Sequence, residues 1–306
     1  MTWAYIPGPF ASTTREEAPG AFALDTDGIR RLFMEEGAMR TGVSCKSVGN
    51  EPMRPATVGT LDWATRTGGR LSLRDRLQLV AQGLLIESRS WPDRFLRRLD
   101  VGRDRLAKID LDQLRIPDSL ACRDAERLCA EQTPPVVLVH SQRSYVWGTI
   151  LAAHDRISFD EELLWIASLL HDLGFVDRGA TAKPECFTLV GARAAMAIDS
   201  EGWDDERRRS VAEAITLHLN LHVDLSHGPE AHLLWAGTRL DAVGWRYWDV
   251  APGTAAAVLE RYPRLDLKEY FPAVFEKEAA LVPGSRTHFY TRYLGASRLV
   301  RRAPLP

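Results

Sequence analysis

FDEELLWIASLLHDLG, residues 159–174, is the stretch of sequence that decides the fold. It predicts an apolar helix, because Ser158 or Asp160 can cap its start and Gly174 can end it. The acidic residues near its start suit the positive end of a helix dipole. The expected helix carries the adjacent histidine and aspartate of the string HD at its C-terminal end.

Helical patterns continue on both sides of this stretch. Apolar residues at spacings of three and four predict a helix over 71–100, with a break near Trp91–Pro92, and another over 136–155. The other expected helices cover 25–39, 188–202, 204–222, 229–245, 253–261, 267–280 and 287–302. The sequence contains no glycine-rich phosphate-binding string, and strands do not alternate with helices. The predicted fold class is therefore all-α.

Composition limits the classes of protein that fit this chain. Of its 306 residues, 45% are hydrophobic and 26% charged, with a net charge of −2, which suits a globular protein without a basic nucleic-acid footprint. We expect no signal peptide, and no stretch approaches the roughly 18 apolar residues of a membrane span. Cys45, Cys122, Cys129 and Cys186 include no C-x-x-C pair, so we expect free thiols in a reducing cytoplasm.

Four residues form a candidate metal-binding set. His171 and Asp172 end one expected helix, while His140 belongs to the helix before it and Asp241 to a later one. Inward-facing helices of a bundle can bring such side chains to one point. A divalent ion there would offset the cost of burying a carboxylate. Imidazole nitrogens and carboxylate oxygens suit zinc, iron or manganese.

The order of these residues, together with four local strings, resembles a known superfamily. The strings are HSQRSYVWG (140–148), ASLLHDLG (167–174), FTLVGARAA (187–195) and AITLHLNLH (214–222). They resemble the HD superfamily of metal-dependent hydrolases and lyases, and within it the HD proteins related to cyanamide hydratase. The resemblance covers roughly residues 118–250.

This resemblance implies a ligand set, a domain organisation and a fold. It implies that His140, His171, Asp172 and Asp241 hold one divalent ion, with zinc favoured over iron or manganese, and leave a position open for water. It also implies an HD-type helical bundle. We expect that bundle to be a metal-binding helical domain over 116–306, with 1–115 as a mostly helical, loop-rich N-terminal extension packed on it.

One departure from the superfamily bears on the number of metals. Two-metal HD phosphodiesterases place a further histidine four residues before a glycine that follows the HD pair. Here Gly191 matches that glycine, and Phe187 stands four residues before it. His218 matches a later histidine of that group but makes a poor second site alone. Proteins similar to cyanamide hydratase also tend to have phenylalanine at this place, so we expect one metal ion.

Catalytic roles are expected for three residues. His218 is the candidate for proton transfer or substrate orientation, with a core histidine as the equal alternative. Arg143 is expected to pair with Asp172 or with another buried carboxylate. Asp172 serves as both a metal ligand and a catalytic group.

Candidate substrate-binding residues lie after the HD pair in the sequence. Lys183 and Glu185 could line the substrate entrance, with a solvated loop as the alternative. Phe187 and His222 complete the set, and for His222 a place at the rim of the site is the alternative.

Several functions remain open at this stage. The first is a hydratase or lyase that adds metal-activated water to a small nitrile- or cyanamide-like compound. The second is a phosphohydrolase or phosphodiesterase acting on a nucleotide or small phosphate ester. A di-iron oxygenase and a non-catalytic binding protein are the others. We expect a cytoplasmic protein with a small-molecule substrate and without nucleic-acid or membrane partners, and a homo-oligomer is left open.

Overall fold

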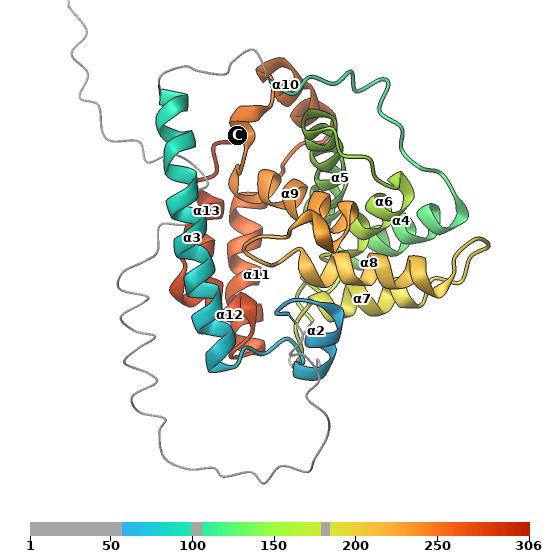
Figure 1. The fold of residues 1–306 in the computed structure, drawn as a ribbon. Coiled ribbons are helices and arrows are strands. Elements are labelled where there is room, and N and C mark those ends of the chain that lie inside the picture. Colours follow the sequence, from blue (N-terminus) through green and yellow to red (C-terminus); the bar gives the residue numbers. More distant parts are fainter. Residues whose placement is uncertain (1–56, 99–105, 179–183) are drawn as a thin grey trace, which may run out of the picture.

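A computed structural model of the chain describes residues 57–98, 106–178 and 184–306. The short helix expected over 25–39 and Cys45 lie outside these residues. The described part consists of helices and connecting segments without a β-strand (Figure 1), so the all-α prediction is confirmed. None of its helices is long and apolar enough to cross a bilayer.

Most of the described helices match the expected ones in order, but those over 61–67 and 120–132 were not predicted. They are α2 (Leu61–Thr67), α3 (Leu73–Arg98), α4 (Leu120–Gln132), α5 (Pro135–Asp155), α6 (Glu161–Leu170), α7 (Thr188–Met196), α8 (Asp205–Leu217), α9 (Pro229–Val243), α10 (Pro252–Arg261), α11 (Leu267–Leu281), α12 (Arg286–Tyr293) and α13 (Ala296–Arg301), with short 3-10 turns η2 (Leu225–His227) and η3 (Tyr247–Asp249).

The main core forms around the pair α5 and α9. Helices α6 and α8 pack on this pair, and α4 packs on α5 and α6. Figure 1 places α3 and α11–α13 on the other side of α9. There α3 shares a second apolar cluster with α2 and α12, which includes Leu79, Trp63 and Tyr290. The ends of α5, α6 and α8 therefore meet between the two parts of the bundle.

Glycines allow α5 and α9 to approach backbone to backbone. A Cβ atom added at Gly237 would lie 2.1 Å from the carbonyl oxygen of Ser144, and one added at Gly148 would lie 3.0 Å from the carbonyl oxygen of Leu233. Such distances leave no room for a side chain. Asp241 lies one helical turn after Gly237, so this crossing controls how closely Asp241 approaches α5.

Substitution of Gly237 is expected to destabilise the protein. Gly237→Ala places a methyl group against the backbone of α5, which should lower the free energy of unfolding by about 1–3 kcal/mol. The matched control is Gly253→Ala in α10, where an added Cβ meets nothing within 4 Å. Thermal unfolding of both variants checks this, and an equal effect in the two would contradict the close crossing.

The structure corrects three local expectations. Helix α3 continues through Trp91–Pro92 instead of breaking there. A proline removes one helical hydrogen bond without requiring a break. The helix expected over 287–302 is divided into α12 and α13, since Gly295 adopts a left-handed φ of 65°. The HD helix ends at Leu170, before Gly174.

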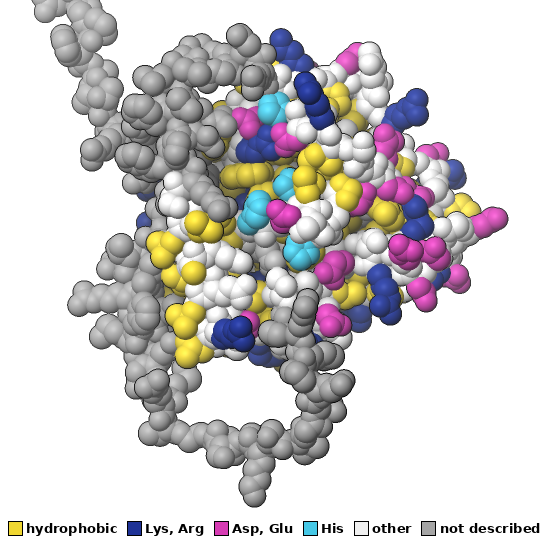
Figure 2. Space-filling view, viewed as in Figure 1, with side chains coloured by type: hydrophobic (Ala, Val, Ile, Leu, Met, Phe, Trp, Pro, Cys, Tyr) yellow, Lys and Arg dark blue, Asp and Glu magenta, His cyan; other side chains and the backbone are white. Residues whose placement is uncertain are grey.

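The surface of α3 carries apolar side chains. Figure 2 shows them over this helix, where Leu73, Leu77, Leu84 and Leu85 are exposed.

The N-terminal part of the described chain packs on the bundle through α2, which contacts α7 and α8. The boundary expected near residue 115 stays a prediction.

Candidate metal centre

Helix ends place the central residues of the site. Asp160 caps the start of α6 by accepting hydrogen bonds from two backbone amides, and the helix runs from there to Leu170. His171 is its C-terminal cap, and Asp172 follows in the turn. That turn lies against the next segment, because a Cβ at Gly174 would be 2.5 Å from the carbonyl oxygen of Phe187.

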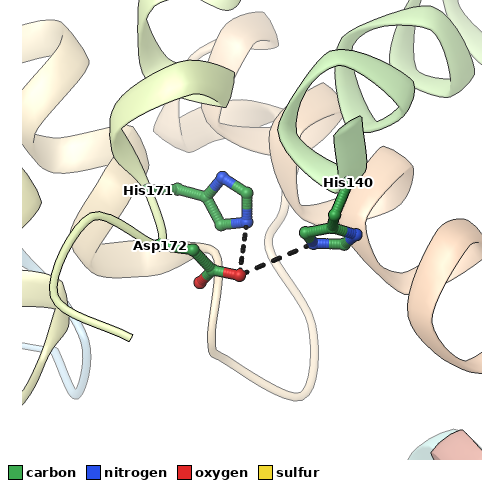
Figure 3. Close-up of side chains that lie close together, drawn as sticks. All are labelled: His140, His171 and Asp172. Carbon is green, nitrogen blue, oxygen red and sulfur yellow. Dashed lines mark ion pairs between the residues drawn. The ribbon is translucent and has the colours of Figure 1, made fainter. Parts of the chain in front are cut away.

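The imidazoles of His140 and His171 converge on the Asp172 carboxylate (Figure 3). The distance to Asp172 Oδ2 is 3.1 Å from His171 Nε2 and 3.6 Å from His140 Nε2. These three side chains are buried, and they offer ligand atoms within 4.8 Å of one another. His218 Nε2 lies 3.8 Å from the other carboxylate oxygen, Oδ1. The two histidines and Asp172 thus form a group that could hold a metal ion.

Two of the imidazoles are oriented in the same way by the helices that precede them. His171 Nδ1 donates a hydrogen bond to the carbonyl oxygen of Ser168 at 2.7 Å, and His218 Nδ1 donates to that of Ile215 at 2.6 Å. Both carbonyls belong to the last turn of a helix, α6 or α8, which ends at the histidine. A carbonyl only accepts, so Nδ1 carries the hydrogen, and in the neutral ring Nε2 keeps its lone pair.

The imidazole of His140 is oriented by a carboxylate instead of a backbone carbonyl. Its Nδ1 lies 2.6 Å from Asp241 Oδ2. The two Asp241 oxygens also accept from Arg143 Nε at 2.6 Å and Nη2 at 2.8 Å, and from Trp147 Nε1 at 2.9 Å. Asp241 thus lies behind His140 and orients its Nε2 toward Asp172. Arg143 pairs with this second buried carboxylate, and the role of Asp241 as a direct ligand stays a prediction.

Charge in this group follows from burial and neighbours. Burial lowers the pKa of His140, and it lowers that of His218 to about 3. Burial alone would raise the pKa of Asp172, but the neighbouring imidazoles outweigh it and lower that pKa. Asp241 is also held well below its ordinary pKa, because Arg143 outweighs the effect of burial. His140 and His218 are therefore neutral, and Asp172 is ionised, at neutral pH.

The donor chemistry fits a divalent cation. Three Nε2 lone pairs and a carboxylate face one another, and all of them are acceptors. His171 Nε2 makes no hydrogen bond of good geometry among the described residues, and it lies 3.1 Å from Asp172 Oδ2. Two buried acceptors in contact are costly unless something positive lies between them. Neutral imidazole nitrogens with a carboxylate oxygen are the ligands that zinc, iron and manganese accept.

A cavity of about 100 Å³ opens beside this group. His140, His171, Asp172 and His218 line one part of it. The remainder is mostly apolar and is formed by Phe175, Phe187, Leu219, Thr238, Arg239, Ala242, Val243, Phe271, Phe275, Tyr290, Ala296, Leu299 and Val300. An engineered apolar cavity of roughly 150 Å³ holds benzene, so this cavity suits a molecule of few atoms.

The predicted substrate residues are placed differently from one another. Phe187 lines the cavity. Glu185 is outside the cavity lining and accepts a hydrogen bond from Arg193. His222 is also outside it and packs against Trp235, with ring centroids 4.9 Å apart. Lys183 lies outside the described residues.

Sequence reasoning missed several residues of the cavity. Phe175, Phe271 and Tyr290 look like ordinary core residues in the sequence, and only their packing brings them to the site. Arg239 did have a signal, because it lies two residues before Asp241 in the largely apolar stretch LLWAGTRLDAV (233–243). An arginine at such a position requires a polar environment or a ligand.

Fold and site together define an all-α protein with a buried His–His–Asp group that could hold a metal ion. Its chain is 26% identical over 175 residues to the cyanamide hydratases DDI2 and DDI3 of Saccharomyces cerevisiae. The aligned part covers 56% of this chain and 78% of each yeast protein. No family model matches the chain. The chain is thus distantly related to cyanamide hydratases, and membership in the HD superfamily stays a prediction.

Proposed function

We propose that this protein is a metal-dependent hydratase that adds water to the nitrile-like carbon of a small cyanamide-like compound. The observation that carries the proposal is the position of three imidazoles around one buried carboxylate: Nε2 of His140, His171 and His218 lies 3.6, 3.1 and 3.8 Å from an oxygen of Asp172. The distant relationship to the yeast cyanamide hydratases supports the choice of reaction.

Different residues of the chain would bind the metal ion and handle the attacking water. His140, His171 and Asp172 would hold the ion, which when bound lowers the pKa of water and polarises the substrate. His218 Nε2 is a free base beside them, since its Nδ1 hydrogen is used by Ile215. It can accept a hydrogen bond from the attacking water and so orient that water toward the substrate carbon. For cyanamide, one water added across the carbon–nitrogen triple bond gives urea.

The cavity favours a small substrate over a nucleotide. Its volume is about 100 Å³ and aromatic rings form much of its wall. A nucleotide needs more room than this. The rings of Phe175, Phe187 and Phe271 also exclude bulk water from the reacting group. A hydratase therefore fits the site better than the phosphohydrolase alternative.

Metal analysis joined to a turnover assay tests the proposal. We expect about one divalent ion per purified chain, urea release from cyanamide, loss of that release after chelation, and recovery with added zinc. A nucleotide panel assayed for phosphate is run in parallel. Bound metal with phosphate release and no urea would replace the proposal by the phosphohydrolase, and a chain free of metal that cannot be loaded would overturn both.

A further inference from the structure

Besides Thr238, whose hydroxyl donates to the carbonyl oxygen of Trp235, two polar side chains outside the metal-binding group line the cavity. They are Tyr290 from α12 and Arg239 from α9. Both carry hydrogen-bond donors, and Asp172 is the one acidic side chain among the described residues that line the cavity.

Tyr290 offers a donor that is built into the wall. Its side chain is 6% exposed, and its hydroxyl finds no hydrogen-bond partner among the residues that the structure describes. Burial raises the pKa of Tyr290 to about 12, while Arg286 and Arg239 act in the opposite direction. The hydroxyl thus keeps its proton at neutral pH and lies in the field of two arginines. A buried hydroxyl in this position calls for an acceptor.

Arg239 brings a positive charge to the same cavity. Its guanidinium stacks on the Trp235 ring, with Cζ 5.7 Å from the ring centroid. Burial lowers the pKa of Arg239 to about 10, so the side chain stays cationic at neutral pH. A guanidinium held in place and partly removed from water binds a carboxylate more strongly than it would on the surface.

We propose that Arg239 and Tyr290 form a carboxylate-binding subsite, so that the substrate is a small cyanamide- or nitrile-type compound that carries a carboxylate. This inference rests on the proposed function for the nitrile-type group of the substrate, whereas the carboxylate is inferred from Arg239 and Tyr290 themselves. The carboxylate would accept from the guanidinium and the phenol, while the nitrile carbon lies at His140, His171 and Asp172. The phenylalanine rings would cover the short carbon link between the two ends.

The test compares N-cyanoglycine with N-isobutylcyanamide, a neutral compound of the same shape. Hydration of N-cyanoglycine forms a bond from the water oxygen to the nitrile carbon, moves both water protons to nitrogen, and gives N-carbamoylglycine. We expect a higher kcat/KM for N-cyanoglycine than for the neutral compound. Arg239→Met should reduce this preference by about 10- to 100-fold and Tyr290→Phe by about tenfold. Arg239→Lys should restore part of it, and Arg123→Met on the exposed face of α4 should leave it unchanged.

Calorimetry separates the subsite from the reaction. N-carbamoylglycine is titrated into the same purified protein and its variants, which measures carboxylate binding without turnover. Hydration of both cyanamides with no preference for the acid, or an equal loss for both in Arg239→Met, overturns the subsite and leaves the hydratase standing. Binding of N-carbamoylglycine that depends on Arg239, in a protein that hydrates neither compound, supports the subsite and removes the proposed reaction. No hydration and no binding removes both.

Discussion

His171→Ala and Asp172→Asn are each expected to remove both the bound metal and the activity. The two side chains supply ligand atoms 3.1 Å apart, at the centre of the buried group. Loss of a residue that merely supports a ligand costs about 10- to 100-fold in metal affinity or activity, so loss of a ligand should cost more. We expect urea release to fall by more than about 100-fold, and metal per chain to fall with it.

A matched histidine controls for this result. His227 is exposed in the short turn before α9 and is remote from the cavity lining. His227→Ala should retain metal and turnover. Metal analysis of the three purified variants gives the readout, and circular dichroism checks that each is folded. Full metal content in His171→Ala and Asp172→Asn would show that the ion, if one binds, lies elsewhere.

Arg143→Met is expected to destabilise the whole fold. Arg143 and Asp241 are both 0% exposed, and two hydrogen bonds of 2.6 and 2.8 Å join them. Removal of one partner leaves a buried carboxylate without its main counter-charge, which costs about 3–5 kcal/mol. Arg123→Met is the control, because Arg123 and Asp118 form an exposed pair that contributes less than about 1 kcal/mol. Chemical denaturation of both variants measures the difference.

The pH dependence of this loss identifies its cause. In the native protein the pKa of Asp241 is depressed, so its contribution to stability is present above the unfolded pKa and is lost as the pH falls through the folded value. Without Arg143 the buried carboxyl should have a raised pKa instead. The deficit of Arg143→Met should therefore shrink as the pH falls toward the unfolded pKa, about 3.9. A deficit that is constant with pH would point to lost packing of the arginine side chain.

Much of the site could be predicted because its residues lie in local patterns. The string HD at the end of an apolar helix, with a histidine in the preceding helix, pointed to His140, His171 and Asp172. The placement of Asp241 could not be read in this way. It depends on the depth of the crossing between α5 and α9, which is a property of two helices far apart in the sequence.

Other misses have similar physical reasons. The HD helix was expected to run to Gly174, whereas it ends at Leu170 and the glycine serves a close approach to Phe187. Tyr290 reads as a core residue until α12 docks against the bundle and brings it to the cavity. Helix patterns in the sequence indicate which residues are apolar and where helices begin. Tertiary packing decides which cavity a side chain enters.

The two helix ends that orient His171 and His218 also give the cavity an electrical polarity. Each C-terminus carries the equivalent of about half a negative charge, so α6 and α8 add to Asp172 in attracting a cation and repelling an anion. Arg239, which also lines the cavity beside Tyr290, adds a positive charge. A polar guest that enters this space would therefore be aligned before any reaction begins, with its negative group toward the arginine and away from the carboxylate.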